Sequence, residues 1–181
     1  MIRPARPADA ARICEIYNHY VRETVITFEE VPVDADEMAG RIRDLLTSAP
    51  WLVAEENGVI AGYAYATPWK TRSAYRFAME STIYMAAEFS GQGIGGTLYA
   101  TLIAELRTRD IHCAIGGIAL PNPASIRLHE RLGFQKIGQF REVGWKFDQW
   151  VDVGYWELLI RGYPASCSHG VTQGSKAGDI A

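Results

Sequence analysis

Hydrophobic and polar residues alternate between Met79 and Met85, and a helical period replaces this alternation beyond Ile94. Over the first stretch the odd-numbered positions face one side, and the even-numbered ones, among them Glu80, face the other. Alternation with aromatic and β-branched residues is typical of a strand. From Ile94 onward, leucines at every fourth position indicate a helix. The segment Gly91-Gln-Gly-Ile-Gly-Gly96 therefore joins a strand to the start of a helix.

The same two periods, together with turn and cap residues, predict the remaining elements. Asn57-Gly58 between two apolar runs predicts a hairpin, and Asn122-Pro123 predicts the start of a short helix that Gly133 ends. Strands are expected at 2–6, 51–56, 59–65, 112–120, 134–140 and 151–159, and further helices after Pro7 or Asp9, after Asp34, and over 124–132. This order predicts an α/β fold, with a mixed, mostly antiparallel twisted sheet, helices on both faces and one central βαβ unit.

Length and composition favour one globular domain. The chain has 181 residues, of which 48% are hydrophobic, and a net charge of −3. We expect a single domain over residues 1–161 and a disordered tail over 162–181, which is rich in Gly and Ser. The charge indicates no nucleic-acid surface, and three distant cysteines form neither a disulfide framework nor a metal motif. No signal peptide or membrane span is visible, so we expect a cytoplasmic protein without a bound metal.

The glycine-rich segment has the character of a phosphate site. Glycine allows the backbone to approach a ligand closely, and the free N–H groups at a helix start attract anions. No Gly-Lys-Ser/Thr follows, which excludes a nucleoside-triphosphate P-loop. The spacing Gly91-x-Gly93-x-x-Gly96 matches a dinucleotide loop, but no acidic residue lies between Asp110 and Glu130, where that motif requires one.

A second pattern matches this segment better. Ser90-Gly-Gln-Gly-Ile-Gly95 resembles the acetyl-coenzyme A loop of the GNAT acetyltransferase superfamily, except that Ser90 occupies the usual Gln/Arg position. The resemblance implies acetyl-CoA as co-substrate, with its pyrophosphate on the loop backbone and its pantetheine along the preceding strand. The cofactor-binding residues implied are Ile83, Tyr84, Met85, Ser90, Gly91, Gln92, Gly93, Ile94, Gly95, Gly96, Asn122 and Ser125.

Two residues near this loop are candidates for catalysis. Glu80 is a carboxylate within an apolar strand, which is costly unless it is paired or functional, and it could remove the proton of an ammonium acceptor. His129 occupies the position of a family tyrosine and could protonate the leaving thiolate. The structural alternatives are a solvated or ion-paired carboxylate for Glu80 and a packing histidine for His129.

The segments Pro68-Trp-Lys-Thr-Arg-Ser-Ala-Tyr75 and Glu80-Ser-Thr-Ile-Tyr84 resemble the phosphinothricin acetyltransferase branch of the superfamily over roughly residues 2–160. Phosphinothricin is a glutamate analogue, and Lys70 and Arg72 have the chemistry to hold its two anionic groups. The substrate-binding residues implied are Phe28, Lys70, Arg72, Tyr75 and Tyr84.

The resemblance implies N-acetylation of a small anionic amino acid, either phosphinothricin or its demethyl form, by direct transfer in a homodimeric enzyme. Two alternatives stay open at this point. One is an acetyltransferase for methionine sulfoximine, methionine sulfone or another small amine. The other is an acyl-CoA-binding sensor without catalytic activity.

Overall fold

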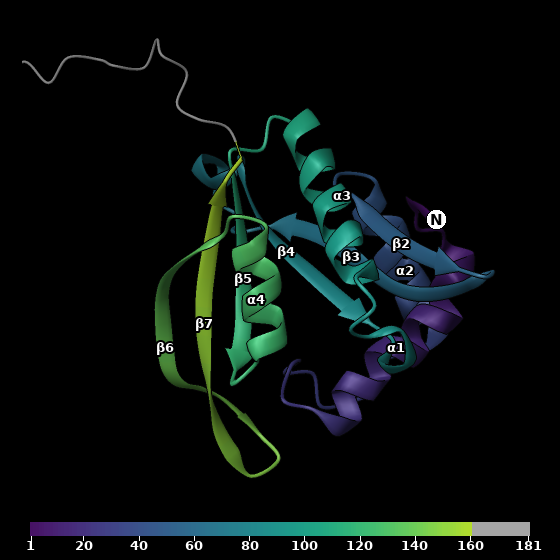
Figure 1. Cartoon of the computed structure of the whole chain (residues 1–181), viewed down its shortest axis with the longest axis horizontal. Coiled ribbons are helices and arrows are strands. Elements are labelled where there is room, and N and C mark those ends of the chain that lie inside the picture. Colours follow the sequence, from purple (N-terminus) through teal and green to yellow (C-terminus); the bar gives the residue numbers. More distant parts are fainter. Residues whose placement is uncertain (161–181) are drawn as a thin grey trace, which may run out of the picture.

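The computed structural model describes residues 1–160 (Figure 1), so the expected tail over 162–181 lies outside the described residues. The elements follow the predicted order: β1 (Ile2–Pro4), α1 (Ala10–Glu23), α2 (Ala35–Leu46), β2 (Trp51–Glu56), β3 (Val59–Pro68), β4 (Ala78–Met85), α3 (Ile94–Thr108), β5 (Cys113–Leu120), α4 (Pro123–Arg131), β6 (Gln135–Lys146) and β7 (Gln149–Leu159). Short 3-10 helices occupy Pro7–Asp9, Ser73–Tyr75 and Ala87–Phe89.

Within these residues the strands form one seven-stranded sheet in the order β1-β2-β3-β4-β5-β7-β6. Each neighbouring pair is antiparallel except β4 and β5, which are the two strands of the βαβ unit. One hydrophobic core lies between the sheet and α1 and α2, and a second lies between the opposite face and α3 and α4. The predicted fold class is therefore confirmed. No helix in residues 1–160 is long and apolar enough to cross a membrane.

The predicted turn and cap residues have the expected local geometry. Asn57 and Gly58 have φ of 51° and 79°, as a tight hairpin turn requires. The Asp34 carboxylate accepts a hydrogen bond from the Glu37 amide at 2.8 Å and caps α2. Gly133 adopts a φ of 92° after α4. Local sequence therefore fixes where these elements begin and end.

Some predicted boundaries are wrong. β3 continues to Pro68 instead of ending at Tyr65. The helix expected after Pro7 or Asp9 begins at Ala10, with Asp9 as its N-cap residue, so its predicted start is confirmed. β6 extends beyond the predicted end at Phe140, to Lys146. A bulge at Glu142, where φ is 52°, interrupts the alternation of side chains there, so the sequence pattern did not reveal this extension. The Asp152 carboxylate accepts a hydrogen bond from the Glu142 amide at 2.8 Å, which compensates for part of the broken ladder.

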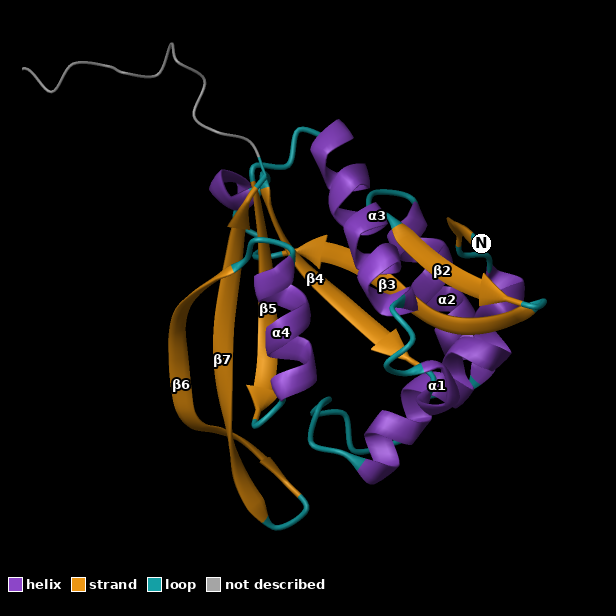
Figure 2. Ribbon diagram, viewed as in Figure 1, coloured by secondary structure: helices purple, strands orange, loops and turns teal. Residues whose placement is uncertain are grey.

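The relation between β4 and β5 determines where a ligand could enter the sheet. The two strands are paired only where Ala78–Glu80 face Cys113–Ile115, and Figure 2 shows them diverging beyond that point. A parallel pair that separates leaves backbone N–H and C=O groups of both strands without ladder partners. Glu80 is the last paired residue of β4, so it stands where this opening begins.

Candidate active site

The Glu80 side chain lies on the sheet face covered by α1 and α2, the same face as its register partner Thr67 on β3. On its other side, a Cβ added to Gly117 of β5 would stand 3.3 Å from Glu80 Oε1 and 3.4 Å from the Tyr155 ring of β7. The carboxylate is therefore bordered by three strands that are far apart in sequence. No salt bridge to Glu80 forms within residues 1–160.

Partial burial raises the pKa of Glu80, and the positive charge of Lys70 lowers it to a smaller extent. The same carboxylate raises the pKa values of Tyr65 and Tyr155, although burial is the larger cause for both. A carboxylate with a raised pKa and without a paired cation has the properties of a general base. The ion-paired alternative considered for Glu80 is not what the geometry shows.

The glycine segment forms an exposed turn directly before α3. Gly91 and Gly93 have φ of 78° and 83°, in the left-handed region that favours glycine. Gly93 is the N-cap residue, and no side chain caps the helix. A Cβ added at Gly91, Gly93 or Gly96 would meet nothing within 4 Å, so this surface is open to a ligand. Together these features form a backbone cradle suited to a pyrophosphate group.

The predicted cofactor residues on β4 divide between the two faces of the sheet. Ile83 and Met85 pack with the core beneath α3, on the side of the glycine segment. A Cβ added at Gly95 would stand 3.3 Å from Met85 Cγ, so α3 approaches β4 closely there. Tyr84 is buried on the opposite face, where its ring lies 4.9 Å from that of Tyr20 and 5.3 Å from that of Tyr17.

His129 is buried at 3% exposure between α4 and β5. Its Nδ1 lies 2.8 Å from the Ser125 carbonyl oxygen, which can only accept, so Nδ1 carries the proton. Nε2 lies 2.9 Å from the Tyr99 hydroxyl, which lies 2.7 Å from Ser81 Oγ. Burial lowers the pKa of His129. A neutral imidazole thus ends a chain of hydroxyl groups that reaches the residue after Glu80.

The α4 N-terminus holds the remaining predicted cofactor residues. Asn122 Oδ1 accepts a hydrogen bond from the Ser125 amide at 3.1 Å and caps the helix. Ser125 Oγ lies 3.4 Å from His129 Nδ1. A Cβ added to Gly116 would stand 2.4 Å from His129 Nε2, so only glycine fits there.

The structure does not bring the predicted substrate residues into one cluster. Lys70 lies near Glu80, with its ammonium 4.5 Å from the Trp69 ring centroid. Arg72 and Tyr75 are exposed around the 3-10 helix Ser73–Tyr75. Phe28 belongs to the connection between α1 and α2, and its ring packs over Gly144 of β6, where a Cβ would stand 2.3 Å from it.

Several residues of this region were missed by sequence reasoning. Tyr99 and Ser81 link His129 to β4, and Tyr155 and Gly117 border Glu80. The sequence could have indicated a role for Tyr99, because the hydroxyl of a tyrosine within the apolar stripe of a helix needs a hydrogen-bond partner when it is buried. Tyr155 and Gly117 depend on strand register, which no local pattern reveals.

Comparison with known proteins identifies similar chains. The family model described as an acetyltransferase (GNAT) domain matches residues 2–154. Phosphinothricin N-acetyltransferase of Streptomyces viridochromogenes is 42% identical over 156 residues, which are 86% of this chain and 85% of that protein. The L-methionine sulfoximine/L-methionine sulfone acetyltransferase of Salmonella typhimurium is 40% identical over 161 residues, 88% of this chain and 94% of that protein.

The structural comparison agrees. The structure of YncA from Salmonella typhimurium with its cofactor acetyl-CoA superposes with a TM-score of 0.88 and 38% sequence identity. The match covers 91% of this chain and 96% of that one.

Proposed function

Because this chain belongs to the GNAT acetyltransferase family and is an acetyl-CoA-dependent N-acetyltransferase, we propose that it acetylates the α-amino group of phosphinothricin or demethylphosphinothricin. The observation that supports this best is the position of Glu80. Its carboxylate is partly buried, has a raised pKa and lies near Lys70 where β4 and β5 diverge. One site thus combines a base for the ammonium proton with a cation for an anionic acceptor.

The glycine segment and the opening between β4 and β5 fit acetyl-CoA. Backbone amides from Ser90 to Gly96 would hold the pyrophosphate, and Ile83–Met85 would border the pantetheine. Asn122 and Ser125 would lie at its far side, at the start of α4. When bound, acetyl-CoA supplies a thioester carbonyl that an uncharged amine can attack.

We propose direct transfer to the amine. Glu80 removes the ammonium proton, itself or through a water, and N–H groups of β4 just after Glu80 stabilise the charge that develops on the carbonyl oxygen. Cys14 is buried beside Asp34, and Cys113 stands at the start of β5, where burial raises its thiol pKa. Neither of these two cysteines of residues 1–160 has the lowered pKa of an activated nucleophile, which favours direct transfer over an acetyl-enzyme.

His129 is proposed to return a proton to the thiolate. Because it is buried and neutral, it cannot contact the sulfur while its present partners remain. Because Nδ1 carries the only proton of the neutral ring, His129 would first take up a second proton at Nε2 from solvent. Nε2 would then donate to Tyr99 and Tyr99 to Ser81, and the Ser81 hydroxyl, which donates to the Ile115 carbonyl oxygen at 3.2 Å, would release its proton to the thiolate. The proposed route from His129 to the opening between β4 and β5 therefore runs through two hydroxyl groups.

Lys70 and Arg72 are proposed to bind the two anionic groups of the acceptor, and Phe28, Tyr75 and Tyr84 to shape the surroundings. Methionine sulfoximine or methionine sulfone is the second candidate acceptor, since a relative of 40% identity bears that name. A sensor without activity would need no unpaired carboxylate at the position of Glu80.

We also propose a homodimer. The hairpin of β6 and β7 exposes about half of each of several large apolar side chains, and exposed apolar patches of this kind mark interaction surfaces. The residues are Ile137, Phe140, Val143, Trp145 and Trp150. Light scattering of the wild type and of Trp145→Glu tests this proposal, because the charge should convert a dimer to a monomer.

Thiol release from acetyl-CoA with a panel of amino acids tests the activity. We expect the highest kcat/KM with phosphinothricin or its demethyl form. A higher value with methionine sulfone would favour the second acceptor. No thiol release with any amine, despite tight acetyl-CoA binding, would favour the sensor.

A further inference from the structure

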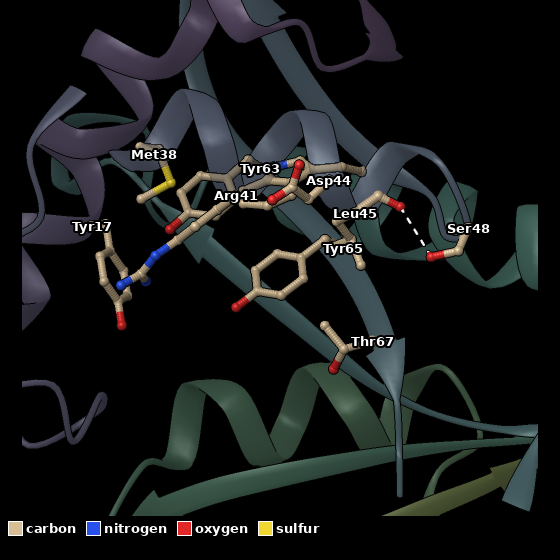
Figure 3. Close-up of a pocket in the computed structure, with 10 residues that line it drawn as sticks. Tyr17, Met38, Arg41, Asp44, Leu45, Ser48, Tyr63, Tyr65 and Thr67 are labelled. Carbon is tan, nitrogen blue, oxygen red and sulfur yellow. Dashed lines mark hydrogen bonds between the residues drawn. The ribbon is translucent and has the colours of Figure 1, made fainter. Parts of the chain in front are cut away.

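We propose that a cavity between α2 and the β2–β3 part of the sheet receives the side chain of a second class of acceptor, namely amines that carry an uncharged aromatic group. The cavity measures about 430 Å³ and lies on the sheet face of Glu80. Figure 3 shows Met38, Arg41 and Leu45 of α2 opposite Tyr65 and Thr67 of β3. This inference rests on the proposed function, because it assigns the cavity to that reaction.

Three aromatic rings lie at the floor of the cavity, of which Trp51 and Tyr63 are buried and Tyr65 is partly exposed. The Trp51 and Tyr65 rings lie 4.5 Å apart at 23°, and the Tyr63 and Tyr65 rings lie 6.2 Å apart at 10°. Met38 and Leu45 of α2 form the apolar wall that faces these rings. Offset stacking and thioether contacts both favour an aromatic guest.

The cavity lies beside Glu80, because one of its lining residues on β3 neighbours Glu80 on β4. Thr67 lines the cavity and is the direct antiparallel partner of Glu80, so the two side chains share one face about 5 Å apart. Tyr65 lines it one pair further along, and its hydroxyl is within electrostatic range of both Glu80 and Arg41. An amine at Glu80 can therefore extend its side chain across Thr67 and over Tyr65.

The charged side chains at the cavity disfavour an anionic guest. Arg41 donates to Glu29 at 2.7 Å and also pairs with Glu37, so two carboxylates already neutralise this cation. Asp44 adds a further carboxylate to the lining, whereas Lys70 does not line the cavity. Phosphinothricin would thus direct its phosphinate elsewhere, and an uncharged ring would fill the cavity.

The test is a substitution that fills the cavity, at a lining residue of α2 with no proposed catalytic role. Leu45→Trp places an indole in the cavity, and Arg43→Trp places the same group on the exposed side of α2 as a control. Acceptors are L-phenylalanine, 2-phenylethylamine and phosphinothricin, with acetyl-CoA and hexanoyl-CoA as donors. We expect Leu45→Trp to lower kcat/KM for both aromatic acceptors at least about tenfold, with phosphinothricin unaffected and Arg43→Trp like the wild type.

Three results would overturn the proposal. The first is wild-type turnover of phosphinothricin without turnover of either aromatic amine, which leaves the proposed function intact. The second is a folded Leu45→Trp variant whose kcat/KM falls equally for all acceptors. The third is a fall in kcat/KM only with hexanoyl-CoA as donor, which would assign the cavity to the acyl group of the donor. If Leu45→Trp does not fold, Leu45→Ala replaces it, with the expected preference shifted toward larger aromatic amines. A wild type inactive with every amine would instead refute the proposed function.

Discussion

The ammonium of Lys146 on β6 donates a hydrogen bond of 2.8 Å to the carbonyl oxygen of Thr27, 119 residues earlier in the chain. Lys146 is only 2% exposed, and no carboxylate forms a salt bridge with it within residues 1–160. Thr27 Oγ1 lies 2.8 Å from the Tyr17 hydroxyl, and the adjacent Phe28 packs on Gly144. The β6–β7 hairpin and α1 therefore hold the segment that carries Phe28 between them.

Lys146→Met should loosen this segment without unfolding the protein. The substitution keeps most of the aliphatic stem, but it leaves the buried Thr27 carbonyl oxygen without its donor, which typically costs about 1–3 kcal/mol. We expect a moderately lowered melting temperature and faster amide hydrogen exchange over residues 24–33. Lys136→Met, at an exposed position of the same strand, is the control. Unchanged exchange in the Lys146 variant would show that packing of Phe28 alone holds the segment.

Gly93→Val should abolish coenzyme A binding. Gly93 has a φ of 83°, and its added side chain would occupy the open space above the glycine turn. Gly58→Val is a matched control, because Gly58 has a φ of 79° and equally open surroundings in the β2–β3 turn. Both variants should lose some stability from backbone strain, but calorimetry should show lost affinity only for Gly93→Val. Equal affinity in both variants would refute the assigned cradle.

The sequence predicted those parts of the molecule that local patterns encode. The glycine turn, the Asp34 cap and the Asn57-Gly58 hairpin each depend on a few neighbouring residues, and each prediction was confirmed. The β6–β7 turn was missed because Phe147-Asp148 adopts positive φ without glycine. The surroundings of Glu80 depend on strand register, which joins β3, β5 and β7 only in the folded chain.

Lys70→Ala and Arg72→Ala should weaken acceptor binding. Removing the partner of an anion that becomes buried costs about 2–5 kcal/mol, so the KM for phosphinothricin should rise about 30-fold or more. Acetyl-CoA affinity should not change. Arg76→Ala removes a neighbouring cation that packs on Phe77 instead, 4.3 Å from its ring centroid, and should behave like the wild type. If all three variants keep the wild-type KM, neither Lys70 nor Arg72 binds the acceptor.

His129→Gln should separate proton transfer from packing. Glutamine can still accept a hydrogen bond from Tyr99, but it cannot take up a proton near neutral pH. We expect kcat to fall by about 10²-fold or more, with unchanged acetyl-CoA affinity and little change in melting temperature. Wild-type kcat in the folded variant would assign His129 a structural role beneath Gly116.

Glu80→Gln tests the central assignment through both activity and stability. Loss of a general base typically costs about 10²–10⁴ in rate, so kcat should fall by that order while the KM for acetyl-CoA changes little. Activity of the wild type requires ionised Glu80, and partial burial raises the pKa of Glu80. The acid limb of the wild-type profile should therefore lie above the ordinary glutamate range, and it should weaken or disappear in the variant.

The stability of the same variant should change in the opposite direction. Since the folded state binds the Glu80 proton more tightly than the unfolded state does, wild-type stability falls as pH rises from the unfolded pKa through the raised folded pKa. Above that window the ionised carboxylate destabilises the fold, and glutamine removes this cost. Glu80→Gln should therefore raise the melting temperature at pH 8 more than at pH 4. If the Glu80→Gln variant keeps the kcat of the wild type between pH 6 and 9, bulk water and not Glu80 removes the ammonium proton. A melting temperature lowered equally at both pH values would identify Glu80 as a structural carboxylate.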